Sequence, residues 1–298
     1  MSKKPAPLSR LSCCGGERIM AALKGKWCTE TYRDTALSFR IKKKLYAKKS
    51  GFQMVEVYET EKHGNLMALD GCYMVSEAEE FVYHDMLAHV PLFAHPNPRN
   101  VLVIGGGDGG TVREVMRHKG VTNIDFVEID PDVYEVSKRY FPALVKGLEA
   151  DKRVKFKFGD GIKFVKAARS EYDVILIDGT DPSEIAGGLF GAEFFKDVHR
   201  ALKPDGIMCM QSEDPWYDLD IIKGVQTRLK KIFKKAGLYL AYIPIYPSGM
   251  WSFSIASKRY APSETRNKKS KIKKFRYYTP ALHKAAFELP QFVKDGIK

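Results

Sequence analysis

The middle of the chain alternates between short apolar runs and runs with helical spacing, and this pattern constrains the fold more than any other sequence feature. Each apolar run has the length and composition of a buried strand, and the run after it has the period of a helix. Such alternation predicts a parallel, doubly wound sheet with helices on both faces. The expected strands are 101–104, 124–129, 154–158, 174–177 and 207–210, and the expected helices are 110–118, 131–140, 162–168 and 192–202.

The N-terminal part of the chain follows a different pattern. Within residues 27–76, short β-prone runs such as 52–60 are separated by turn signals, among them Asp70-Gly71. This spacing predicts a small antiparallel β-sheet domain over 27–76, followed by an α/β domain over 77–298 that includes a C-terminal extension. Residues 1–26 have no periodicity, and we expect a flexible tail there.

The junction between these two regions predicts a helix. Apolar residues recur at helical spacing over 77–92. We expect Pro91, together with the proline-rich run 95–98, to end this helix, because proline lacks the N–H group that a helix interior needs.

Composition excludes several classes of protein. The longest apolar runs fall short of the roughly 18 residues that span a bilayer. The N-terminus also lacks the apolar stretch of a signal peptide, so we expect a cytoplasmic protein. The five cysteines are odd in number and form no C-x-x-C pair, which favours reduced thiols. The histidines form no ligand-type cluster in the sequence, so no metal is expected.

The formal net charge of +13 raises the alternative of a nucleic-acid-binding protein. The excess lies mainly in two stretches, 42–49 and 268–276, outside the segment that alternates. Among the lysines of the first stretch, Tyr46 is the single aromatic residue that a base would stack on. Solvated faces or a loop therefore explain both stretches better than a nucleic-acid site.

A glycine-rich turn follows the first expected strand, with the sequence GGGDGG over 105–110. Glycines there permit a tight turn and the close approach of a ligand to the N-terminus of the next helix. Glu128 ends the next strand, at roughly the 20-residue spacing at which related folds place an acid on a ribose. Asp160 ends the third and is placed to accept a hydrogen bond from an adenine amino group. Turn chemistry explains the glycines alone, and helix capping explains either acid alone. Three such positions at successive strand ends resemble the Rossmann-like class I S-adenosylmethionine-dependent transferase fold.

Three aspartates then indicate the chemistry. Asp108, among the glycines, would repel the carboxylate of S-adenosylmethionine and attract an ammonium, which is the group that the decarboxylated molecule retains. Asp178 and Asp181 lie three residues apart after the fourth strand. Such a pair can orient an acceptor amine and take its proton. An Asp-Pro turn with a self-capping carboxylate is the structural alternative for the pair.

Several motifs in this order resemble the spermidine synthases, the polyamine aminopropyltransferases of bacterial type. The resemblance runs from about Trp27 to Pro290 and rests on the segments 69–71, 81–91, 105–110, 178–182 and 246–253. It implies transfer of the aminopropyl group of decarboxylated S-adenosylmethionine to putrescine, giving spermidine and 5'-methylthioadenosine. It also implies a homodimer or homotetramer, no permanent cofactor and no metal.

The resemblance further implies roles for individual residues. The catalytic pair is Asp178, as the base, with Tyr83. The donor-binding residues are Gln53, Gly105, Gly107, Asp108, Glu128, Asp160 and Gly161. The acceptor-binding residues are His84, Asp181, Tyr246, Glu213 and Trp27. Trp251 belongs either to the acceptor channel or to the core, and residues 181–190 would form part of a gate.

Two departures from the family pattern concern the acceptor side and the donor side. Gly179 stands where the family usually has serine, and Met74 stands where many members have glutamine. Neither removes a carboxylate, so activity is expected to persist. The acceptor's length stays open among putrescine, cadaverine, agmatine and spermidine, because pocket shape sets it. A methyltransferase and a non-catalytic ligand sensor on the same fold are the remaining alternatives.

Overall fold

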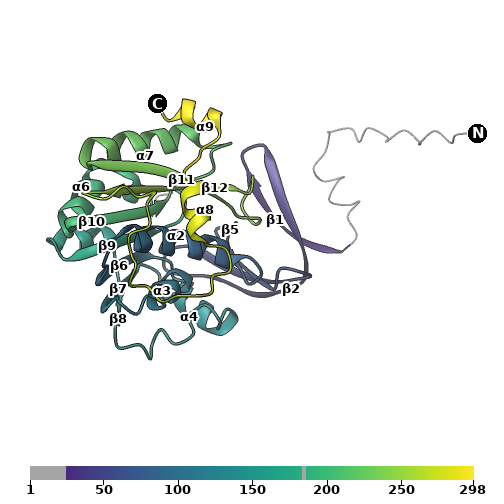
Figure 1. The fold of residues 1–298 in the computed structure, drawn as a ribbon. Coiled ribbons are helices and arrows are strands. Elements are labelled where there is room, and N and C mark those ends of the chain that lie inside the picture. The colour runs from purple at the N-terminus through teal and green to yellow at the C-terminus, as the bar shows by residue number, and fades with distance from the viewer. Residues whose placement is uncertain (1–24, 183–185) are drawn as a thin grey trace, which may run out of the picture.

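The computed structural model describes residues 25–182 and 186–298, which form two sheets (Figure 1). All but the last two residues of the expected tail, 1–26, lie outside the described residues, as do Cys13 and Cys14. The three described cysteines, Cys28, Cys72 and Cys209, are free thiols.

The N-terminal sheet is antiparallel, and its strands neighbour one another in sequence order. The Asp70-Gly71 turn joins the last two strands, with φ values of 49° and 87°. Positive φ at both central residues is what a type I′ hairpin turn requires. The strands are β1 (Lys26–Tyr32), β2 (Thr35–Lys49), β3 (Met54–Thr60), β4 (Asn65–Leu69) and β5 (Cys72–Ser76).

The first lysine-rich stretch lies on β2 and is not a loop. Lysines of this stretch form ion pairs with the neighbouring strand β3. Lys42 Nζ lies 3.0 Å from Glu59, and Lys44 Nζ lies 2.6 Å from Glu56. The stretch is therefore a solvated strand face.

The larger sheet has seven strands in the order β11-β12-β10-β9-β6-β7-β8. Six of them run parallel, but β12 is antiparallel to both of its neighbours, β10 and β11. The five strands that the alternation predicts all run parallel, as expected, whereas β11 and β12 were not among the predicted strands. The strands are β6 (Asn100–Gly105), β7 (Asn123–Glu128), β8 (Val154–Phe158), β9 (Tyr172–Asp178), β10 (Leu202–Gln211), β11 (Lys235–Tyr242) and β12 (Met250–Ser257).

Helices cover both faces of the larger sheet. None of those in the described part of the chain has the length and apolar character needed to cross a membrane. They are α2 (Glu80–Ala94), α3 (Gly110–Met116), α4 (Pro131–Tyr140), α5 (Gly161–Ala167), α6 (Ala192–Ala201), α7 (Leu219–Ile232), α8 (Pro280–Ala285), α9 (Gln291–Gly296) and the short 3-10 helix η1 (Gly187–Phe190).

The end of α2 differs from the expectation. Pro91 lies inside the helix, which continues to Ala94. The helix stops at His95, whose ψ of 130° is extended. His95 precedes Pro96, and the residue before a proline is disfavoured in the helical region. The proline-rich run, and not Pro91, therefore ends the helix.

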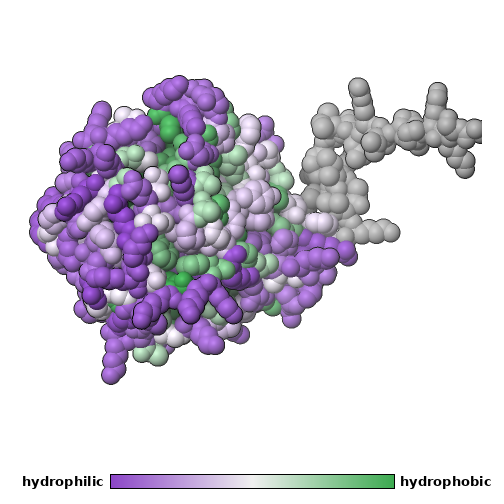
Figure 2. Space-filling view, in the orientation of Figure 1, coloured by the Kyte–Doolittle hydropathy of each residue, from purple (hydrophilic) through white to green (hydrophobic). Residues whose placement is uncertain are grey.

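A buried apolar cluster joins the two sheets. Val57 and Met67 of the N-terminal sheet pack with Val133 and Phe141, which belong to α4 and its C-terminal end. This contact places the N-terminal sheet against the carboxyl end of the larger sheet. Figure 2 shows that the face seen in Figure 1 is mostly hydrophilic, with many of its apolar side chains in a band that runs down its middle.

Candidate active site

The carboxyl ends of four neighbouring parallel strands meet at one cavity. Gly105 of β6 pairs in register with Asp178 of β9, and Glu128 ends β7 beside β8. Such strand ends are where doubly wound sheets bind ligands. We call it the larger cavity, because a smaller one adjoins it. The expected residues that line it are Gln53, Tyr83, His84, Gly105, Gly107, Asp108, Glu128, Asp160, Gly161, Asp178 and Tyr246.

The glycine-rich turn packs directly against Asp178. Gly105 and Gly106 have φ values of 78° and 72°, a region that side chains rarely adopt. The Gly106 N–H donates to the Asp178 carbonyl at 2.8 Å. A Cβ on Gly106 would lie 2.5 Å from Oδ2 of Asp178. The glycines thus serve both the tight turn and the close approach between two strand ends.

Asp108 and His84 form an ion pair at the wall of this cavity. His84 Nε2 lies 3.2 Å from Asp108 Oδ1, and its Nδ1 lies 2.7 Å from Glu80. Burial alone would lower the pKa of His84, but Asp108 and Glu80 together raise it to about 10. Burial opposes ionisation of Asp108, yet the His84 charge and the Gly110 N–H hold its pKa below the usual value. Both groups are therefore charged at neutral pH.

Asp178 lies between two hydroxyl donors. Tyr83 Oη donates to Oδ1 at 2.6 Å, and Thr111 Oγ1 donates to Oδ2 at 2.6 Å. Burial and the nearby Asp108 charge raise the pKa of Asp178 to about 6, against the effect of His84 and the two hydroxyls. The carboxylate is thus held in one orientation and can accept a proton close to neutral pH.

The two other strand-end acids differ in their surroundings. Glu128 is buried and accepts the Asp130 N–H, and burial raises its pKa to about 7. Asp160 caps α5 by accepting the backbone N–H groups of Ile162 and Lys163. The capping alternative therefore holds for Asp160, whose side chain nonetheless borders the cavity.

Gln53 reaches this site from the N-terminal sheet. Its side-chain amide donates to Asp130 at 3.0 Å, and the same carboxylate oxygen accepts the Ser50 hydroxyl at 2.6 Å. Asp130 also caps α4, because its side chain accepts the Asp132 N–H. A residue 75 positions upstream of Glu128 thus closes the same cavity.

A smaller cavity adjoins the larger one. The two share walls made by Met74, Tyr83, Gly179, Thr180 and Tyr246. The smaller cavity is further lined by Glu30, Tyr32, Cys72, Tyr73, Asp181, Gln211, Pro247 and Trp251. Gly179 and Met74, the two departures from the family pattern, therefore both lie at the junction of the cavities.

Carboxylates gather around the smaller cavity. Burial, with repulsion from Asp218, raises the pKa of Asp181 to about 6. Burial and Asp181 raise the pKa of Glu213 to about 9. Glu213 lies behind the wall, where Gln211 contacts it, and its Oε2 is buried without a hydrogen-bond partner among the described residues. This environment favours a cationic ligand.

The aromatic side chains separate into two groups. Tyr246 donates to the Met74 carbonyl at 3.1 Å, and its ring lies 4.4 Å from that of Trp251. Trp251 is thus both buried and part of the cavity wall. Trp27, on β1, lines neither cavity. His84 lines the larger cavity beside Asp108, and the acceptor-binding role that the resemblance implies for it stays a prediction.

Part of the expected gate cannot be placed. Residues 183–185 lie outside the described residues, but Ala186 and Leu189 on their C-terminal side line the larger cavity.

Sequence reasoning missed Glu30, Glu80 and Thr111. A lone acid on a strand and a threonine on a helix carry no motif, so no local signal marks them.

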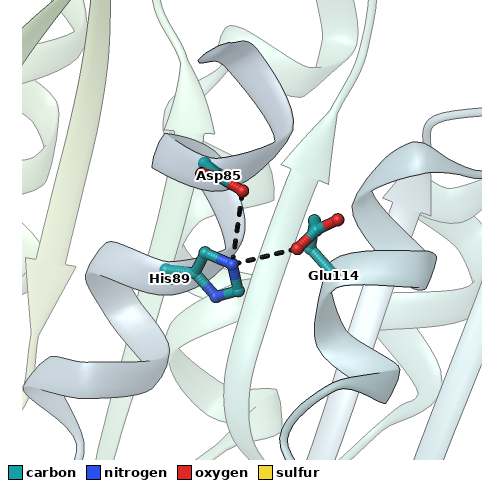
Figure 3. A group of neighbouring side chains, drawn as sticks. All are labelled: Asp85, His89 and Glu114. Atoms are coloured by element: carbon teal, nitrogen blue, oxygen red, sulfur yellow. Dashed lines mark hydrogen bonds and ion pairs between the residues drawn. The ribbon is translucent and has the colours of Figure 1, made fainter. Parts of the chain in front are cut away.

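A second group of ligand-type side chains lies away from both cavities (Figure 3). His89 Nε2 lies 3.0 Å from Glu114 and 3.5 Å from Asp85. Arg117 and Arg113 both contact Glu114, and Asp85 Oδ2 accepts three backbone N–H groups from residues 276–278. Guanidinium groups already neutralise this cluster, which fastens the C-terminal segment to α2 and α3.

The strand order, the single antiparallel strand β12 and the glycine-rich turn together define the Rossmann-like class I S-adenosylmethionine-dependent transferase fold, as expected. It is preceded here by the expected small antiparallel sheet. Two sequence families match the two parts. Residues 80–268 match the spermine/spermidine synthase domain, and residues 26–77 match the spermidine synthase tetramerisation domain.

Individual proteins agree with this match. The polyamine aminopropyltransferase of Bacillus cytotoxicus is 45% identical over 91% of this chain and 99% of its own length. The enzyme of that name from Moorella thermoacetica is 44% identical over 93% of this chain and 98% of its own length. A crystal structure of spermidine synthase with the transition-state analogue AdoDATO superposes with a TM-score of 0.86 at 38% identity, covering 92% of this chain and 96% of the other. The crystal structure of spermidine synthase from Thermotoga maritima superposes with a TM-score of 0.83 at 36% sequence identity, covering 92% of this chain and 95% of the other. The chain belongs to the spermine/spermidine synthase family.

Proposed function

We propose that the chain is a polyamine aminopropyltransferase that transfers the aminopropyl group of decarboxylated S-adenosylmethionine to putrescine. The observation that carries the proposal is the ionised Asp108 on the glycine-rich turn, in the same cavity as Asp178. A carboxylate at this place suits a donor that presents an ammonium, and it repels one that also presents a carboxylate. The curated relatives are named for this class of reaction.

The donor would occupy the larger cavity. Asp108 would bind its ammonium through Oδ2, because Oδ1 is engaged by His84 and the Gly110 N–H. Glu128 would accept hydrogen bonds from the ribose hydroxyls, and Asp160 with Gly161 would border the adenine. A spermidine synthase of homologous fold binds the transition-state analogue AdoDATO, which supports a substrate site within this fold.

The reaction would be a direct displacement. The acceptor nitrogen attacks the methylene carbon beside the sulfonium, the carbon–sulfur bond breaks, and its electron pair goes to sulfur to give 5'-methylthioadenosine. Before the attack, the acceptor ammonium beside Asp178 gives its proton to this carboxylate, which Tyr83 and Thr111 hold in place, and the secondary ammonium formed by the attack leaves as part of the product. The sulfonium is already a good leaving group, so orientation and proton removal are the main tasks of the protein.

The acceptor would lie in the smaller cavity, between Asp181 and Tyr246. A diamine is a dication at neutral pH. Burial raises the pKa values of Asp181 and Glu213, and repulsion from Asp218 on Asp181 and from Asp181 on Glu213 adds to the effect. A cation relieves that repulsion. The match to the tetramerisation domain supports a homo-oligomer, which we propose to be a tetramer.

The proposal is tested by mass spectrometry of the products. Purified protein is incubated with decarboxylated S-adenosylmethionine and, separately, putrescine, cadaverine, agmatine and spermidine. We expect spermidine and 5'-methylthioadenosine, with putrescine the fastest acceptor. If another amine turned over faster, that amine and not putrescine would be the preferred acceptor. Parallel reactions with S-adenosylmethionine that yield S-adenosylhomocysteine would instead identify a methyltransferase.

A further inference from the structure

Glu80 lines the larger cavity but has no part in the proposed mechanism. It begins α2 and is only 6% exposed. His84 lies four positions further along the same helix, so the two side chains share one face of α2. A carboxylate this deeply buried costs stability unless cations compensate it, and its partners therefore indicate what it does.

Cations surround the Glu80 carboxylate. Arg113 of α3 donates to Oε2 at 2.8 Å and to Oε1 at 3.3 Å. His84 Nδ1 lies 2.7 Å from Oε2, and the Arg276 guanidinium lies 3.5 Å from Oε1. Burial opposes ionisation of Glu80, but His84 and Arg113 hold its pKa below the usual value. Glu80 is therefore a carboxylate, not a carboxylic acid, at neutral pH.

The ring of His84 is confined between Glu80 and the glycine-rich turn. Its other nitrogen, Nε2, lies 3.2 Å from Oδ1 of Asp108. A Cβ on Gly110 would lie 2.2 Å from Cε1 of the ring and 2.4 Å from Nδ1. The ring thus occupies the space that a side chain at position 110 would need. Gly110 makes room for a side chain of the protein itself, and this fixes where the two ring nitrogens point.

These contacts form a row of alternating charges that leads into the larger cavity. The row runs from Arg113 to Glu80, then to His84, and ends at Asp108. Oδ1 of Asp108 takes both His84 and the Gly110 N–H, the latter at 2.6 Å. The ammonium of the proposed donor would be the next cation in the row. Glu80 is separated from that ammonium by two side chains, so it can influence the donor only through them.

We propose that Glu80 is a positioning residue for donor binding. It accepts the Nδ1–H of His84 and thereby keeps the imidazolium charged, with its Nε2–H directed at Oδ1 of Asp108, so that Oδ2 faces the donor's ammonium. The inference rests on the proposed function and deepens it, because it explains how a buried aspartate stays ionised before the donor arrives. Hydrogen bonds between charged partners in a buried site are the strong ones.

The proposal has a consequence for the linkage between protons and the donor. In the parent, Glu80 keeps the proton on His84 whether or not the donor is bound. Without the Glu80 charge, that proton and the donor's ammonium compete for Asp108, so donor binding releases a proton and weakens as the pH falls.

Other groups at the cavity also respond to pH. Asp178 and Glu128, with pKa values raised to about 6 and about 7 chiefly by burial, titrate in the parent as well. The guanidinium groups of Arg113 and Arg276 stay charged throughout. The expectation therefore concerns the ratio between a variant and the parent, in which the titrations that both proteins share cancel.

Calorimetric titration with decarboxylated S-adenosylmethionine tests the proposal. Glu80→Gln replaces the carboxylate by an amide of the same size. We expect its Kd for the donor to exceed that of the parent by about threefold at pH 8.5 and by ~10-fold or more at pH 7. Titrations in buffers of different ionisation enthalpy should show that the variant releases more protons on binding than the parent.

Glu114→Gln is the matched control. Glu114 is also buried and lies 2.9 Å from the same Arg113 guanidinium, but it lines neither cavity. Its loss therefore leaves Arg113 uncompensated, as the loss of Glu80 does, without reaching His84. We expect this control to lower Tm but to keep the Kd for the donor within about twofold of the parent at both pH values.

A double variant tests whether Glu80 acts through His84. In protein that already carries His84→Gln, adding Glu80→Gln should change the Kd for the donor by less than about twofold, because no imidazolium is left to hold. The double variant removes both charges of the pair. Its comparison with His84→Gln therefore decides the question even if Glu80→Gln alone does not fold.

The outcomes separate the possible roles of Glu80. A loss that grows as the pH falls, and that is confined to Glu80→Gln, supports the proposal. Equal losses in Glu80→Gln and Glu114→Gln would mean that Glu80 acts only through the fold. An unchanged Kd would mean that it positions nothing, and a further loss in the double variant would mean that it acts independently of His84. Each of these three results overturns the inference. Parent protein that binds no decarboxylated S-adenosylmethionine would instead overturn the proposed function itself.

Discussion

Tyr83 donates a 2.6 Å hydrogen bond to Asp178, although the two residues are 95 positions apart in the chain. The hydroxyl belongs to α2, and the carboxylate belongs to the end of β9. Hydrogen bonds to a carboxylate lower its pKa, yet burial and the charge of Asp108 prevail and raise that of Asp178 to about 6. The pair combines a fixed orientation with a basicity suited to accepting a proton.

The first prediction concerns this pair. Asp178→Asn should lower kcat by ~100-fold or more, because it removes the proposed base, and Tyr83→Phe should lower it by ~10-fold, because the carboxylate loses one orienting donor. Initial rates of aminopropyl transfer measure both effects. Calorimetric titration with the donor should give a dissociation constant close to that of the parent. Near-parental turnover by Asp178→Asn would contradict the assignment of the base.

The second prediction concerns His84 and pH. Its folded-state pKa of about 10 lies above the ordinary value of 6.5. Protonated His84 therefore contributes stability that is complete below pH 6.5 and is lost as the pH rises through 10. We expect Tm to fall further between pH 6.5 and pH 10 in the parent than in His84→Gln, by about 2 °C or more. Parallel Tm curves for the two proteins would show that His84 carries no such charge.

The third prediction concerns the glycine-rich turn. Gly106→Ala places a methyl group at a positive φ, which costs about 1–2 kcal/mol, and pushes it against Oδ2 of Asp178. We expect both a lower unfolding midpoint in urea and a loss of ~10-fold or more in kcat. Gly120→Ala is the control, because nothing lies within 4 Å of its added Cβ. If the two variants behaved alike, the close contact between Gly106 and Asp178 would have no consequence.

The fourth prediction concerns the cluster in Figure 3. Asp85→Asn removes the charge that holds the backbone N–H groups of residues 276–278, while the guanidinium of Arg117 still faces the site. We expect a loss of about 3 kcal/mol in the free energy of unfolding, since breaking a buried charge pair leaves its partners uncompensated. Urea denaturation measures it. Asp295→Asn, at an exposed site near the C-terminus, should leave the midpoint unchanged, and an unchanged midpoint for Asp85→Asn would refute the anchoring role.

Local patterns predicted the elements that have strong local signals. The helix over 131–140 begins and ends at the expected residues, because Asp130 caps it and Pro131 starts it. The strand over 154–158 is also as expected. The direction of β12 was not predictable in this way. An apolar run has the same period whether its strand runs parallel or antiparallel, and only the partners that it meets decide the direction.

The sequence by itself determined the fold class and which strand ends carry carboxylates, because each depends on neighbours within a few residues. Only the tertiary structure decided what those carboxylates face. It placed His84 against Asp108, Tyr83 and Thr111 on Asp178, and Glu30 in the wall of the smaller cavity. Burial and Coulomb interactions depend on distances through space, and the chain brings these charges together only when its two sheets pack.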